Sequence, residues 1–222
     1  MRISGLERNL SIAKARYEQA VQALAPKHQG GEWQEYESSY EALLFAEREL
    51  CAAKGEEYAV PLEFPIKWSI GAPLPHLIAS GRRVFLTFYI STPDPDWDGT
   101  YINVKDPQSN EIESLALVEF NRPTSVKLGS PNDEVFEGHR LAGRGLEAYT
   151  AQIVRNSRWV SEIESINSVH SQYNPEVWLN KKHYIFWFHD DTFECIAESY
   201  TVEIHKCTMS ELLDKVMKRL LL

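Results

Sequence analysis

Residues 183–202 read HYIFWFHDDTFECIAESYTV, and this stretch decides the fold that the sequence predicts. Aromatic and β-branched residues on both sides of a short acidic break are typical of a β-hairpin deep in a sheet. A two-residue turn at Asp190-Asp191 would place Trp187 opposite Glu194. A longer turn would change the cross-strand partners.

The period of two along a strand sorts the side chains of this hairpin into two faces. The apolar face carries Tyr184, Phe186, Phe188, Phe193, Cys195 and Ala197. The mixed face carries His183, Ile185, Trp187, His189, Glu194, Ile196 and Glu198. Such a mixed face either lines a partly dry pocket with shifted proton affinities or is a half-exposed structural face crossed by the N-terminal helices. Trp187, His189 and Glu194 are therefore ligand-binding candidates, and both alternatives stay open.

The first 55 residues show the helical period instead. Apolar positions recur at steps of three and four in two stretches: Leu6, Leu10, Ala13, Tyr17, Val21 and Leu24, then Trp33, Tyr36, Tyr40, Leu43, Leu44 and Leu50. Breakers around residues 26–31 separate the stretches, and Gly55 ends the second. This pattern predicts an α-helical hairpin over residues 1–55. It either packs on its own chain or provides a surface for a partner or a homodimer.

From residue 60 the period changes towards two, with turn-forming breaks between short runs. Strands are predicted at Phe64–Ile70, Arg83–Ile90, Thr100–Lys105, Ser114–Phe120, Ser125–Leu128 and Ala148–Val154. Thr208 and Glu211 have the spacing of a capping box at the start of a C-terminal helix. The fold class is therefore α+β: residues 60–222 form one compact unit on a central antiparallel sheet, joined by the N-terminal helical hairpin and a C-terminal helix.

Composition excludes several classes of function. The chain has 222 residues and a formal net charge of −9, which disfavours a nucleic-acid partner because phosphate binding needs clustered Lys and Arg. Neither a signal peptide nor an apolar run long enough to span a membrane is present. The three cysteines include no C-x-x-C pair, and no cofactor-binding motif occurs. We expect a cytoplasmic protein without a cofactor or a membrane partner.

An acidic loop, Asp94-Pro-Asp96-Trp-Asp98-Gly99, begins like a calcium-binding EF loop. The twelfth position of that loop should be a bidentate Glu, and here it is Lys105. The flanking segments also resemble strands rather than helices. Asp94, Asp96 and Asp98 are therefore only weak candidates for a non-EF cation site, and a solvated hairpin loop is the alternative.

The section from Gly129 to Gly145 is rich in glycine and charge. Glycines allow a backbone to approach an anion closely, and arginines offer a planar fork to a carboxylate or a phosphate. The ligand-binding candidates in this loop are Glu137, His139, Arg140 and Arg144. A structural Ω-loop is the alternative, because no Walker or dinucleotide-binding pattern surrounds them.

Three segments together resemble a bacterial family of hypothetical proteins: residues 129–139 (GSPNDEVFEGH), residues 156–159 (NSRW) and residues 183–198. The resemblance lies within residues 129–200. It implies a folded bacterial domain, and it assigns no activity and no functional residue, since no activity is established for that family.

Two classes of function remain. The first is a binding or interaction module that uses the helical hairpin or the mixed face of the 183–198 hairpin. The alternative is a small hydrolase that gathers acids and histidines from the 129–145 loop and the 183–198 hairpin. Neither a G-x-S-x-G elbow nor an H-E-x-x-H motif is present, so the sequence favours the binding module over an enzyme.

Overall fold

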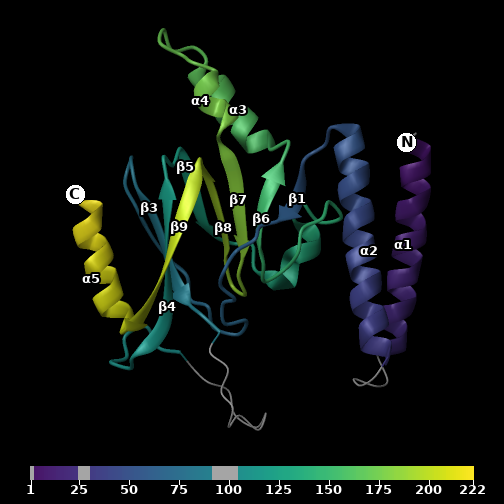
Figure 1. Ribbon diagram of the computed structural model, residues 1–222, viewed down its shortest axis with the longest axis horizontal. Helices are drawn as coiled ribbons and strands as arrows, with labels where there is room; N and C mark the ends of the chain where they lie inside the picture. The colour runs from purple at the N-terminus through teal and green to yellow at the C-terminus, as the bar shows by residue number, and fades with distance from the viewer. Residues whose placement is uncertain (1–2, 25–30, 92–104) are drawn as a thin grey trace. The chain divides into compact units, whose positions relative to one another are not determined.

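The computed structural model of this chain describes residues 3–24, 31–91 and 105–222 (Figure 1). The chain divides into two compact units. The smaller unit comprises Met1–Val60, Glu137–Leu146 and Val154–Arg158, and the larger comprises Pro61–Phe136, Glu147–Ile153 and Trp159–Leu222. Each unit is described by itself below.

The smaller unit is dominated by the predicted pair of helices, α1 (Ile3–Leu24) and α2 (Gly31–Lys54). The ring of Tyr17 lies 5.6 Å from that of Tyr36 and 5.4 Å from that of Tyr40, measured between centroids. Leu44 is 4% exposed, whereas Leu10, Tyr17 and Tyr40 are only partly buried. The seam between the helices is therefore aromatic along part of its length.

Two of the apolar positions predicted for the helical hairpin, Val21 and Trp33, are not buried between the helices. Val21 and Trp33 are 42% and 49% exposed, while Ala20 is 4% exposed. Ala20 and Val21 follow Tyr17 by three and four residues, and so lie about 60° and about 40° to opposite sides of it, which places the buried face of α1 on the Ala20 side. The strand that follows α2 is β1 (Tyr58–Pro61), which the sequence did not predict.

The larger unit is built on two antiparallel sheets. Their strands are β2 (His76–Ala79), β3 (Val84–Tyr89), β4 (Glu113–Asn121), β5 (Ser125–Gly129), β6 (Ala151–Arg155), β7 (Lys182–Trp187), β8 (Thr192–Ala197) and β9 (Ser199–Cys207). One sheet has the order β6-β7-β8-β5, in which β1 is the further neighbour of β6, and the other has the order β2-β3-β4-β9. The helical elements are a 3-10 helix η1 (Asp133–Gly138), α3 (Arg158–Asn167), α4 (Glu176–Leu179) and α5 (Met209–Leu220).

An aromatic core joins the two sheets of the larger unit. All six residues of the predicted apolar face belong to it: Tyr184, Phe186, Phe188, Phe193, Cys195 and Ala197. Phe88 of β3 and Phe120 of β4 enter the same core from the other sheet. Burial raises the pKa of Cys195 to about 12, so this thiol is an inert part of the core.

A second, smaller core lies on the opposite side of β3 and β4, where α5 packs with Met209, Leu212 and Val216. The predicted capping box begins this helix: the Thr208 side chain accepts from the Glu211 backbone, and Glu211 accepts from the backbone of Thr208. The α+β class with its helical pair, antiparallel sheets and C-terminal helix is therefore confirmed, with two sheets in place of one central sheet.

Several predicted strands need correction. Phe64–Ile70 forms no strand, because only Trp68 makes a single bridge, to Ile90. Its alternating apolar residues, Phe64, Ile66 and Trp68, instead enter the core, where Phe64 packs partly buried beside Trp68. Most of the strand predicted at Thr100–Lys105 lies outside the described residues, and β2 was not predicted.

The hairpin of β7 and β8 has the predicted faces but not the predicted partners. Trp187 faces Thr192 and Ile185 faces Glu194, because the turn is centred on His189-Asp190 rather than on Asp190-Asp191. The Phe188 backbone donates to the Asp191 carbonyl at 2.9 Å and closes this turn. Moving the turn by one residue changes the cross-strand register by two residues, so side chains that share a face continue to share it.

Candidate functional site

The mixed face of the hairpin holds a buried histidine–glutamate pair. His183 of β7 is fully buried, and its Nε2 lies 2.8 Å from Oε2 of Glu194 on β8. The carboxylate of Glu194 has a side-chain exposure of 10%. A buried ion pair or hydrogen-bonded pair of this kind fixes the geometry of both groups.

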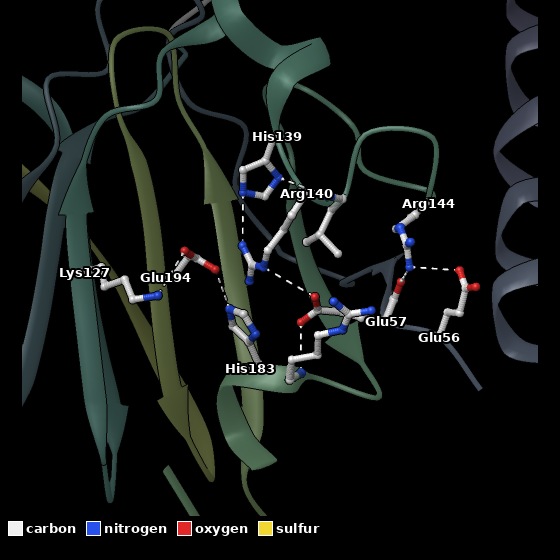
Figure 2. Close-up of polar contacts among 10 residues, drawn as sticks. Glu56, Glu57, Lys127, His139, Arg140, Arg144, His183 and Glu194 are labelled. Carbon is white, nitrogen blue, oxygen red and sulfur yellow. Dashed lines mark hydrogen bonds and ion pairs between the residues drawn. The ribbon is translucent and has the colours of Figure 1, made fainter. Parts of the chain in front are cut away.

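A lysine and a tryptophan complete this arrangement, and Figure 2 shows the lysine, Lys127, beside Glu194. Nζ of Lys127, on β5, lies 3.7 Å from Oε1 of Glu194. The same ammonium stands 3.7 Å above the ring of Trp159, on α3. The Trp159 ring in turn meets His183 edge-on, with centroids 5.1 Å apart. The Lys127 ammonium is thus held by a cation–π contact with Trp159 on one side and by an ion pair with Glu194 on the other.

This arrangement favours the structural alternative for the mixed face. Glu194 lies between two partners of its own unit, and Trp187 is fully buried with Phe136 packed against its ring at 5.0 Å between centroids. Trp187 and Glu194, two of the three ligand-binding candidates on the hairpin, are therefore packed among other side chains of the larger unit. His189 is the exception, with 41% of its side chain exposed.

A second polar cluster surrounds His189 at the hairpin turn. Its members are Asp133 from η1, Tyr149 from the segment before β6, and His189 and Asp190 from the turn. The Tyr149 hydroxyl donates to Oδ2 of Asp133, and Nε2 of His189 lies 3.7 Å from that same oxygen. Nδ1 of His189 lies 3.0 Å from Oδ1 of Asp190. The backbone amide of Asp133 donates to the His189 carbonyl at 3.0 Å, so η1 and the turn are tied directly.

The electrostatics of this cluster follow from its carboxylates. The hydrogen bond to Asp190 raises the pKa of His189, burial opposes this shift, and the nearby charge of Asp133 adds to it. Burial and the hydrogen bond to Asp133 raise the pKa of Tyr149 to about 12. Tyr149 also has a left-handed backbone with φ of 58°, which is uncommon outside glycine. A protonatable imidazole, a phenol and two carboxylates thus meet at a partly exposed place.

The loop candidates of the smaller unit are engaged with its own glutamates. Nε of Arg140 lies 3.4 Å from Oε2 of Glu57, a carboxylate of 3% side-chain exposure. The other oxygen of Glu57 accepts from the backbone amide of Arg158 at 3.0 Å, the first residue of α3. The Arg140 guanidinium also lies 3.2 Å from Nε2 of His139 (Figure 2). The guanidinium of Arg140 therefore binds the carboxylate of Glu57, a residue that was not among the predicted site residues.

Arg144 is held in the same way. Its guanidinium lies 3.0 Å from Oε2 of Glu56 and donates to the Glu57 carbonyl at 3.4 Å. Of the four loop candidates, Glu137 is exposed and contributes no described contact to this network. Arg140 and Arg144, which the sequence predicted as ligand-binding residues, thus link this loop to Glu56 and Glu57 in the segment after α2.

The structure explains why residue 145 of this loop is a glycine. Its φ is +79°, and a Cβ there would meet Arg48 at 2.6 Å and the Ala59 carbonyl oxygen at 2.7 Å. Its amide donates to Oε2 of Glu47 at 2.8 Å. Burial raises the pKa of Glu47, and the bond from this amide opposes that shift. The close backbone approach that glycine permits is therefore made to Arg48 of α2 and to Ala59 of β1, within the same unit.

Metal binding finds no support in the part of the chain that is described. No group of three or more His, Cys, Asp or Glu side chains there is arranged to hold a metal ion. The weak cation candidates Asp94, Asp96 and Asp98 lie outside the described residues. None of the described helices is long and apolar enough to cross a membrane.

Sequence reasoning missed Glu57, Asp133 and Tyr149. No local pattern marks these residues, because each meets partners from distant parts of the sequence. Comparison of the chain with models of protein families, with curated proteins and with solved structures gave no match. The resemblance within residues 129–200 therefore stays an expectation, and function has to be argued from the described surface.

Proposed function

We propose that this protein is an interaction module that binds a basic, partly apolar segment of a partner protein along the outer face of α2. The surface in question is a stripe of five residues at steps of four, Trp33, Glu37, Glu41, Phe45 and Glu49, which we call the α2 stripe. Residues four apart are neighbours on the surface of a helix, so these side chains form a continuous row, which winds about 160° around α2 from Trp33 to Glu49.

The observation that carries the proposal is the exposure of two large aromatic side chains among these glutamates. Phe45 is 65% exposed and Trp33 is 49% exposed, and all three glutamates are exposed. The Trp33 indole donates to Oε1 of Glu37 at 2.9 Å, which holds the ring along the helix. Aromatic residues ready for contact are typical of the centres of binding surfaces.

The charge of the α2 stripe is uncompensated within its own helix. No Lys or Arg stands three or four positions from Glu37, Glu41 or Glu49. Glu37 and Glu41 are like charges at a spacing of four, which destabilises a helix by roughly 0.2–0.5 kcal/mol. A basic partner would relieve this repulsion when it binds.

The same chemistry selects the kind of partner. Lys or Arg side chains would pair with the glutamates and stack on Trp33, while apolar side chains would cover Phe45. A homodimer through residues 1–55 is disfavoured at this surface, because two copies of the α2 stripe would place glutamate against glutamate. We infer a heterologous protein partner in which basic and apolar residues alternate at helical spacing.

Fluorescence anisotropy with a labelled amphipathic peptide tests this proposal. The probe is a helical peptide of Leu and Lys in heptads, and its counterpart carries Glu in place of Lys. We expect binding of the Lys peptide only, and an affinity that falls as the salt concentration rises from about 0.05 M to about 0.5 M. Phe45→Ala and Glu41→Lys should each weaken binding.

Two matched variants serve as controls. Ile112→Ala removes an equally exposed apolar side chain, at 74% exposure, from the larger unit. Glu18→Lys reverses an exposed charge on α1. The proposal fails if these variants weaken peptide binding as much as Phe45→Ala and Glu41→Lys do, or if the Glu peptide binds equally well.

A small hydrolase is the second candidate, and one contact favours it. Asp133 of the 129–145 loop and His189 of the 183–198 hairpin lie together in the larger unit, with Tyr149 bonded to the same carboxylate. An imidazole oriented by a carboxylate is the usual arrangement for proton transfer. Hydrolysis of chromogenic carboxylate and phosphate esters by the parent and by His189→Gln tests this candidate, which is lost if the two rates are equal.

A further inference from the structure

Strand β9 forms an unusually long and regular edge of its sheet. It spans nine residues, Ser199–Cys207, and Figure 1 shows it as the long yellow strand that leads into α5. It is the last strand in the order β2-β3-β4-β9, and β4 is its one paired neighbour among the described strands. Nine consecutive residues pair with β4 in a single register without a bulge.

This edge lacks three of the usual protections against pairing with another strand, namely short length, Pro and a bulge, although it carries the charged residues Glu203 and Lys206. Edge strands are normally short, or are interrupted by Pro, Gly or a bulge. The other terminal strands fit that rule: β2 has four residues, β1 has four and includes Pro61, and β5 has five and ends in Gly129. β9, with the sequence SYTVEIHKC, contains neither Pro nor Gly.

The inner face of β9 carries an apolar row that the chain leaves partly open. Tyr200 and Val202 pack against the aromatic core, whereas Ile204 is 59% exposed. Its ladder partner on β4, Ala116, is fully buried. The apolar surface of this sheet therefore extends to the exposed edge of its last strand.

We propose that β9 pairs antiparallel with β9 of a second copy of this chain, about a two-fold axis at Val202, and so joins two sheets into one. In this register Val202 faces itself, and Tyr200 of each copy faces Ile204 of the other. Aromatic and β-branched residues opposite each other are favourable cross-strand pairs. A symmetric pairing of this kind forms a closed dimer.

The charges at the two ends of β9 select this register. Pairing about Val202 brings Glu198, just before the strand, opposite Lys206 of the other copy, and does so twice. Glu198 already lies among cations, 3.5 Å from Lys181 and 3.6 Å from Arg122, and Lys206 is exposed. A register centred on Glu203 would instead place that glutamate opposite itself, which is unfavourable.

The opposite face of β9 presents no charge conflict in the proposed register. Glu203 faces Thr201 of the other copy, and its carboxylate is already held by Arg219 of α5 at 2.6 Å. Ser199 faces His205. Backbone hydrogen bonds along the two edges would supply the affinity, as in other cases of strand addition.

Sedimentation equilibrium over a range of protein concentrations tests the dimer. We expect the parent chain to reach twice the monomer mass, and Ile204→Lys to raise the dissociation constant by about tenfold or more. Ile204 is mostly exposed, so this change leaves the monomer folded. Ile112→Lys, at another exposed isoleucine, should leave the mass unchanged.

Disulfide trapping tests the register. In a Cys207→Ser background, Val202→Cys should form a cross-linked dimer under mild oxidation, because residues that face each other across a ladder have Cα atoms close enough for a disulfide. Glu203→Cys should cross-link much less. A parent chain that stays monomeric at all concentrations overturns the proposal, and so does a dimer that survives Ile204→Lys with no trapping at Val202. Neither result bears on peptide binding by the α2 stripe.

Discussion

The imidazole of His183 and the carboxylate of Glu194 are hydrogen-bonded at 2.8 Å, although the two residues do not face each other across the hairpin. The ladder pairs Glu194 with Ile185 and His183 with Ile196. The bond is therefore diagonal, between side chains that reach past their direct partners. A slip of β7 against β8 would break it, so this pair helps to specify the register of the central hairpin.

Truncation of His183 should destabilise the larger unit. His183→Ala leaves the Glu194 carboxylate buried without its imidazole partner, and we expect a loss of about 2–4 kcal/mol in the free energy of unfolding. Urea titration of His183→Ala, Glu194→Gln and the double variant gives the coupling energy between them. Lys127→Ala is the control, because 52% of the Lys127 side chain is exposed and its loss should stay below about 1 kcal/mol. A coupling energy near zero would contradict the inferred pair.

Phe186 should be among the most sensitive positions of the aromatic core. It is fully buried, and its ring lies within 6 Å of those of Phe64, Trp68 and Phe193, measured between centroids. Phe186→Ala should reduce the free energy of unfolding by about 3–5 kcal/mol, since it removes a large buried side chain and leaves a cavity. Phe45→Ala on the exposed α2 stripe should change it by less than about 0.5 kcal/mol. Similar losses for both variants would mean that the core is misplaced.

Two glycines of one loop separate steric from conformational effects. Gly143 and Gly145 both have positive φ, but only Gly145 faces atoms that a Cβ would strike. Gly143→Ala should reduce the stability by about 1–2 kcal/mol through the left-handed backbone alone. Gly145→Ala should lose clearly more, because Arg48 and the segment at Ala59 must also move. Thermal and urea unfolding measure the difference, and equal losses would refute the close approach to α2.

His189 should make stability depend on pH. Its pKa is raised above the unfolded value near 6.5, first by the hydrogen bond to Asp190. The folded protein therefore binds this proton more tightly than the unfolded chain does. The resulting stabilisation is fully present below the unfolded pKa and is lost as pH rises through the folded one. NMR titration of the ring should give a lower pKa in Asp190→Asn, and an unchanged value would show that Asp190 is not the cause.

The sequence predicted the faces of the β7–β8 hairpin because strand periodicity alone decides them. It could not predict the partners, since His189, Asp190 and Asp191 all suit a turn. Long-range bonds decide between them: the Asp133 amide binds the His189 carbonyl at 3.0 Å, and the Thr192 hydroxyl donates to the Pro131 carbonyl at 2.8 Å. No sequence pattern within the hairpin indicates these long-range bonds.

The polar network of the smaller unit was beyond prediction for the same reason. Glu57 has no sequence signal, yet its carboxylate meets an amide 101 residues later, at Arg158. The sequence predicted Arg140 and Arg144 as binding residues for a carboxylate or phosphate of a ligand. Their carboxylates are Glu57 and Glu56 of the chain itself, which spacing in the sequence could not reveal.

The division of the smaller unit among three separate segments has a consequence for synthesis on the ribosome. The helical pair leaves the ribosome well before Glu137–Leu146 and Val154–Arg158 have been translated. Until then Glu47 lacks the amide of Gly145, and Arg48 lacks the carbonyl of Gly145 that it binds at 2.8 Å. The shortest contiguous fragment that contains the whole unit ends at Arg158, and it severs β7, β8 and β9 from the larger unit. The two units are therefore interlaced along the chain, so neither is encoded by one uninterrupted piece of the gene.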